Sequence, residues 1–71
     1  MNYMKEIGKR IKELRVEHNL SQQQFGQLLA VSQDTISLWE NGKSLPTTEN
    51  LIVIAKTFQV STDYILCLVD Y

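Results

Sequence analysis

Residues 20–43 decide the fold, because LSQQQFGQLLAVSQDTISLWENGK has the pattern of two short helices joined by a tight turn. Ser21 can cap the first helix, and Gln24 three residues later completes an S-x-x-Q capping box. The apolar residues that follow have the i, i+3, i+4 spacing of a buried helical face, namely Phe25, Leu28 and Leu29. Ser32 then supplies a second cap, so the stretch predicts a helix-turn-helix over about residues 21–40.

The second of these helices, over about residues 32–40, carries the functional clue. If Ile36 points inward, the rotation of about 100° per residue places Asp34 and Leu38 almost opposite it. Gln33, in the first turn, is free to project beyond the helix. A helix-turn-helix presents the N-terminal residues of its second helix to the major groove of DNA. We therefore expect four side chains to read base edges: Gln33, Asp34, Ser37 and Leu38.

Phosphate contacts are expected to come largely from neutral groups, because the net charge is −1 and the isoelectric point is near 5.7. The charge is uneven: residues 1–20 carry +2 and residues 44–71 carry −2, which would orient the first half toward a phosphate backbone. An ordinary mixed-charge helical surface explains the charge alone equally well. The expected phosphate-binding residues are Gln22 at a helix N-terminus, Thr35 at the groove edge, Asn41 and Lys43 in the following loop, and Arg10.

Three further helices surround this pair. Apolar residues over about 3–18 recur at i, i+3, i+7 and i+10, which indicates an amphipathic helix. Pro46 and Thr47 mark the start of a fourth helix with strict i, i+3, i+4, i+7 apolar spacing. Ser61 is predicted to cap a fifth helix that extends to Val69.

The apolar side chains of this fifth helix spread over about 200° of a helical wheel, more than the roughly 100° stripe that one core needs. We expect the excess to be covered in a homodimer, through Leu66, Val69 and Tyr71. A wholly intramolecular core remains the alternative.

Arg15 lies on the apolar side of the first helix, near Ile11 and Leu14, where a cation needs a partner. Glu40 is the candidate, because it follows Trp39 on the inner edge of the predicted DNA-reading helix. The alternative is two unrelated surface charges.

The motif L-S-Q-x-x-[FL]-[AG]-x-x-x-x-V-S-x-x-T-I-S-x-W-E-N-G-K-x-x-P resembles the phage-repressor and Cro-type helix-turn-helix family, the xenobiotic-response-element-like transcriptional regulators. The resemblance extends over nearly the whole chain and implies an all-α, compact five-helix, lambda-repressor-like DNA-binding domain. It also implies an ion pair between Arg15 and Glu40. The chain departs from the family at Gly26, where alanine is usual, and at Ala30, where the turn usually has glycine.

The 71 residues allow one small domain, residues 1–71, near the lower limit for burying a core unaided. A single cysteine, Cys67, excludes an internal disulfide and a cysteine-based zinc site. No apolar run reaches the roughly 18 residues of a membrane span, and residues 1–10 lack the apolar core of a signal peptide. We therefore expect a cytoplasmic chain with no metal, cofactor, membrane or small-molecule partner.

Catalytic signatures are missing: the sequence has no histidine paired with a nucleophile, no glycine-rich phosphate loop and no H-E-x-x-H. An enzyme is not expected. The predicted function is a sequence-specific transcriptional regulator, a repressor by resemblance, that binds a double-stranded DNA operator as a homodimer. The alternative is a protein-interaction module, such as an antitoxin or antirepressor, that uses the same fold.

Overall fold

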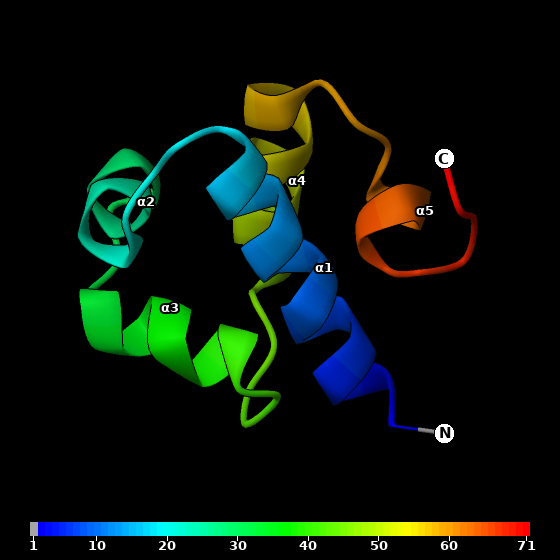
Figure 1. Cartoon of the computed structure of the whole chain (residues 1–71), viewed down its shortest axis with the longest axis horizontal. Helices are drawn as coiled ribbons and strands as arrows, with labels where there is room; N and C mark the ends of the chain where they lie inside the picture. The colour runs from blue at the N-terminus through cyan, green and yellow to red at the C-terminus, as the bar shows by residue number, and fades with distance from the viewer. Residues whose placement is uncertain (1) are drawn as a thin grey trace.

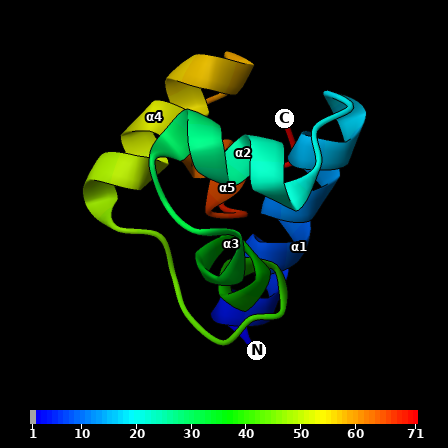
Figure 2. The same ribbon diagram turned by 90° about the vertical axis from the view of Figure 1, so that its left-hand side faces the viewer.

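The computed structural model describes residues 2–71 as five helices, with no strand among them, which confirms the all-α prediction. The helices are α1 (Tyr3–Glu17), α2 (Gln22–Leu29), α3 (Gln33–Glu40), α4 (Thr48–Phe58) and α5 (Thr62–Ile65). Figure 1 shows α2 and α3 on one side of α1 and α5 on its other side. Turned by 90°, Figure 2 shows α3 below α2, next to the N-terminal half of α1. None of the helices in residues 2–71 has the length and apolarity needed to cross a membrane.

Side-chain caps begin every one of the five helices. Ser21 Oγ accepts from the Gln24 N–H at 3.0 Å while Gln24 Oε1 accepts from the Ser21 N–H at 2.8 Å, which completes the predicted capping box. The other caps are Asn2, Ser32, Thr47 and Ser61. The polar residue before each helical run therefore determines where the helix begins.

A left-handed residue follows each helix and closes it. Gly42 occupies this position after α3, with φ +71°, but the other four positions hold Asn19, Ala30, Gln59 and Cys67. At each end the next N–H donates to a carbonyl five residues back, for example Val31 to Gly26 at 2.9 Å. This is the Schellman bond, which usually relies on glycine. Ala30, at the turn where the family usually has glycine, adopts the left-handed conformation, with φ +58°.

Ala30→Gly is expected to raise the free energy of unfolding by roughly 1 kcal/mol, because a Cβ is strained in the left-handed region. Chemical denaturation measures the change. Ala55→Gly is the matched control: Ala55 lies inside α4, where glycine should instead destabilise by about 1 kcal/mol. A loss of stability in Ala30→Gly would contradict the strain assigned to this turn.

Ten apolar side chains form the core between the helices, and Phe25, Ile36 and Ile54 are among those with no exposed area. α3 packs against both α1 and α2. Its contact with α1 is close enough that a Cβ built on Gly8 would lie 2.1 Å from the Trp39 carbonyl oxygen. Glycine at position 8 therefore permits the helix crossing that holds α3 in place.

The prediction of a C-terminal helix extending to Val69 is wrong. α5 ends at Ile65, and Cys67 adopts the left-handed conformation, with φ +62°. The Leu68 N–H donates to the Asp63 carbonyl at 2.9 Å, which turns the chain back. A single helical wheel over this segment therefore does not describe its apolar surface.

Arg10 holds this C-terminal turn. Its Nη1 donates to the Tyr64 carbonyl at 2.7 Å and the Val69 carbonyl at 3.4 Å, and its guanidinium lies 4.1 Å from the centroid of the Tyr64 ring. The cation is thus used to pack α5 and the last residues on α1. Arg10, which was expected to bind phosphate, therefore has its Nη1 engaged by the C-terminal segment of its own chain.

Candidate nucleic-acid interface

The outward face of α3 presents the side chains predicted to read bases. Gln33 and Asp34 are exposed in its first turn, and 44% of the Leu38 surface is exposed although Leu38 is apolar. Ile36 and Trp39 are buried on the opposite face. Ser37 is half-buried, and its Oγ accepts from Asn41 Nδ2 at 3.2 Å. The face therefore combines amide, carboxylate and apolar groups, which suit the donor, acceptor and methyl pattern of a major groove.

The end of α3 positions the loop that follows it. The Lys43 N–H donates to the Leu38 carbonyl at 2.9 Å and the Gly42 N–H to the Trp39 carbonyl at 3.0 Å. These two bonds form a Schellman motif around Gly42. Asn41 and Lys43 are left exposed beside the outward face of α3, where they could reach a phosphate backbone.

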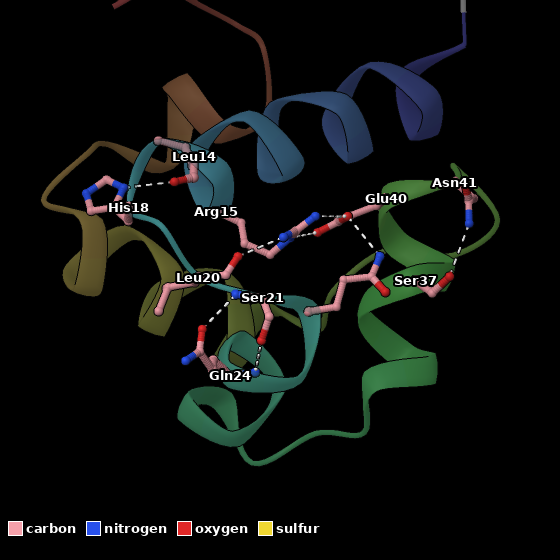
Figure 3. Close-up of polar contacts among 10 residues, drawn as sticks. Leu14, Arg15, His18, Leu20, Ser21, Gln24, Ser37, Glu40 and Asn41 are labelled. Atoms are coloured by element: carbon pink, nitrogen blue, oxygen red, sulfur yellow. Dashed lines mark hydrogen bonds and ion pairs between the residues drawn. The ribbon is translucent and has the colours of Figure 1, made fainter.

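The predicted ion pair between Arg15 and Glu40 is confirmed. Arg15 Nε and Nη2 donate to the two Glu40 carboxylate oxygens at 2.6 and 3.0 Å, as Figure 3 shows. The two side chains are only 11% and 3% exposed. Arg15 Nη1 also donates to the Leu20 carbonyl at 2.7 Å. Arg15 therefore ties α1 to α3 through the bidentate pair and to the end of the α1–α2 loop through Leu20.

Gln22 joins this network, because its Nε2 donates to Glu40 Oε1 at 3.1 Å. The side chain expected to bind phosphate is therefore held inside the protein through its amide nitrogen. The backbone N–H groups of Gln22 and Gln23, in the first turn of α2, donate to no group among residues 2–71. They leave the α2 N-terminus able to accept an anion, since the helix dipole and free donors both favour negative charge there.

Thr35 is also less free than expected. It is half-buried, and its Oγ1 lies 2.9 Å from Ser32 Oγ, so the hydroxyl reinforces the cap of α3. Of the predicted phosphate-binding side chains, Asn41 and Lys43 are the exposed ones in this region.

The sequence interpretation did not single out Lys5 and Lys9, which line an open groove of about 440 Å³ together with Asn41. Their i, i+4 spacing indicates that they share one face of α1. Only the structure shows that this face lies beside the end of α3. Among residues 2–71, no three His, Cys, Asp or Glu side chains could hold a metal ion together.

Comparison with known proteins agrees with this geometry. Residues 11–65 match the Helix-turn-helix family model, so the chain belongs to that family. It is 41% identical over 61 residues to the HTH-type transcriptional activator BcrR of Enterococcus faecalis, covering 86% of this chain and 30% of BcrR. It is 42% identical over 55 residues to the antitoxin PezA of Streptococcus pneumoniae, covering 78% of this chain and 35% of PezA. The chain thus spans about a third of the length of these relatives.

A solved structure has the same arrangement of helices. The P22 c2 repressor, crystallised with a synthetic operator, superposes with a TM-score of 0.77 at 36% identity, covering 83% of this chain and 89% of the repressor chain. The likeness supports the five-helix repressor-type fold that the sequence predicted.

Proposed function

We propose that this chain is a sequence-specific double-stranded DNA-binding domain of a cytoplasmic transcriptional regulator, a repressor, with α3 in the major groove. The observation that carries this proposal is the outward face of α3, where Gln33, Asp34 and Leu38 project into solvent without a structural role. An exposed leucine between polar side chains serves no core. The P22 c2 repressor, which shares the fold and was crystallised with a synthetic operator, supports DNA binding by a domain of this kind.

Each exposed side chain can recognise one base edge. Gln33 can pair bidentately with N6 and N7 of adenine, Asp34 can accept from N4 of cytosine, and Leu38 can pack on a thymine methyl. Asn41, Lys43 and the free N–H groups at the α2 N-terminus would hold the backbone. Gln22 could contribute only if its amide leaves Glu40 or binds through its oxygen.

Gln33→Ala is expected to weaken binding to the preferred duplex by about 1–3 kcal/mol and to relax selectivity at one base pair, whereas Lys43→Ala should weaken all sequences alike. The preferred duplex is first enriched from a random library, and affinities are measured by gel shift on single-base variants. Gln27→Ala, which removes an exposed glutamine near the end of α2, is the matched control. Unchanged base preference in both Gln33→Ala and Asp34→Ala would contradict groove reading by α3.

We further propose a homodimer through the C-terminal segment, placing two copies of α3 about 34 Å apart, one turn of B-DNA. Leu66 and Val69 are half-buried against their own chain, but Leu68 and Tyr71 are 66% and 89% exposed. Sedimentation at high micromolar concentration, with and without the enriched duplex, should show a dimer. A monomer under both conditions would exclude this assembly.

A second candidate is a protein-interaction module, favoured by the 42% identity to the antitoxin PezA and by the acidic residues 44–71. The same library enrichment separates the two functions. A DNA-reading domain enriches one sequence, whereas a module that binds only protein enriches none.

A further inference from the structure

Three lysines of α1 form a continuous row, here called the lysine strip: Lys5, Lys9 and Lys12. All three are exposed, and their i, i+4, i+7 spacing places them within about 60° of one another around the helix. At 1.5 Å per residue the strip is about 10 Å long. Since one DNA strand carries a phosphate every 3.4 Å or so along the axis, a row of this length can reach more than one phosphate.

The lysines of the strip form no ion pair with the acids of the same helix, although Lys9 and Lys12 line a shallow groove with Glu13 and Glu17. Glu6, Glu13 and Glu17 lie within about 40° of each other on the neighbouring face. That face continues toward Arg10, which packs against α5. Arg15 with Glu40 is the one ion pair among residues 2–71. On the exposed side of α1 the lysines therefore lie toward α3 and the acids toward α5, and Lys9 borders both groups.

The strip begins where the loop after α3 touches α1. A Cβ built on Gly42 would lie 2.9 Å from Lys5 Cα, so this loop packs directly on the strip's first residue. Lys5 and Lys9 line a groove with Glu6, Glu40 and Asn41. Glu40 is already paired with Arg15, which leaves Glu6 as the groove's unpaired acid. Figures 1 and 2 both show the N-terminal half of α1 next to α3.

We propose that the lysine strip binds the DNA phosphate backbone beside the bases that α3 reads, continuing the track that begins at Asn41 and Lys43. This inference rests on the proposed function and assigns that function a second, sequence-independent contact surface. A DNA backbone fits the strip better than an acidic peptide does, because the strip is continuous with a loop adjoining the outward face of α3. The strip would also provide cationic phosphate contacts from α1, whose Arg10 is already engaged by Tyr64 of α5.

The test compares salt dependence on the duplex enriched by the wild-type chain. The slope of log Kobs against log salt should become shallower by about 1 in Lys9→Gln, which removes one charged phosphate partner. Changing Lys5, Lys9 and Lys12 together to glutamine should flatten it by about 1 for each of these lysines that binds a phosphate. Base preference should remain that of the wild type. Lys9→Arg, which keeps the charge, should keep the slope.

Lys56→Gln, which changes an exposed lysine of α4, is the matched control and should leave the slope unchanged. Wild-type slopes in both Lys9→Gln and the triple variant would overturn the proposal and leave the strip to a partner other than DNA. An equal flattening in Lys56→Gln would also overturn it, because the effect would then report net charge alone. Circular dichroism checks that the variants remain folded, and the single Lys9→Gln change keeps the test valid if the triple variant does not. Failure of the wild-type chain to enrich any duplex would instead refute the proposed function itself.

Discussion

Arg15→Ala is expected to lower the free energy of unfolding by about 3–5 kcal/mol, a large part of the stability of so small a domain. The substitution strands the Glu40 carboxylate at 3% exposure, with Gln22 as its remaining side-chain donor. It also removes the donor to the Leu20 carbonyl. Exposed pairs contribute at most about 1 kcal/mol, so the measurement distinguishes a buried pair from a surface pair.

Urea denaturation of Arg15→Ala, Glu40→Ala and the double variant completes a mutant cycle, which isolates the coupling between the two side chains. Lys12→Ala, which removes an exposed cation from the same helix, should change stability by no more than about 0.5 kcal/mol. A loss of only a few tenths of a kcal/mol in Arg15→Ala would contradict a structural role for the pair.

Gly8→Ala is the second substitution with a large expected effect. In an unobstructed helix it should stabilise by roughly 0.5–1 kcal/mol, because alanine is the better helix former. At this crossing the new Cβ would lie 2.1 Å from the Trp39 carbonyl oxygen and 3.2 Å from that of Glu40. Both obstacles are backbone, so α1 and α3 must separate, and overpacking of this kind costs about 1–3 kcal/mol.

The sign of the stability change is therefore diagnostic for Gly8→Ala. Thermal unfolding followed by Trp39 fluorescence measures both the stability and the local repacking, since Trp39 is 3% exposed at the crossing. The affinity of Gly8→Ala for the enriched duplex should fall together with its stability, because α3 moves relative to the α2 N-terminus. A stabilised variant with unchanged fluorescence would contradict the close approach.

The helix starts and the helix-turn-helix could be predicted because local chemistry determines them. Ser21 with Gln24 and the lone caps Ser32 and Ser61 satisfy donors a few residues away, so neighbouring residues suffice to identify them. Arg15 was predictable for a different reason. A cation on an apolar helix face demands a partner, and Glu40 lay on the matching face of α3.

The end of α5 could not be predicted, because long-range contacts decide it. Leu66 to Val69 contain no glycine or proline to signal a stop, yet Cys67 turns left-handed and Arg10 binds the carbonyl of Val69 from 59 residues away. The role of Arg10 was missed for the same reason. Helical spacing gave its position on α1 but not which element would pack there.

The exposure of the outward face of α3 followed from helical periodicity, but the hydrogen-bond partners of the nearby polar side chains did not. Gln22 lies at the start of α2, where a free amide is expected, yet it is half-buried and Glu40 holds its nitrogen. Thr35 likewise has a local partner in Ser32. Hydrogen bonds between side chains depend on rotamers and on tertiary packing, which spacing along the chain does not specify.

The helix ends show that this chain could still gain stability. Four of its five Schellman turns place a residue with a Cβ in the left-handed region, and only the turn at Gly42 avoids the strain. Ala30 and Gln59 lie at the ends of different helices, so the gains from replacing each with glycine should add, at roughly 1 kcal/mol apiece. Natural selection tends to leave a protein above a threshold rather than at an optimum. Glycine at these turns should therefore give a more stable domain, on which the outward face of α3 could be redesigned without loss of folding.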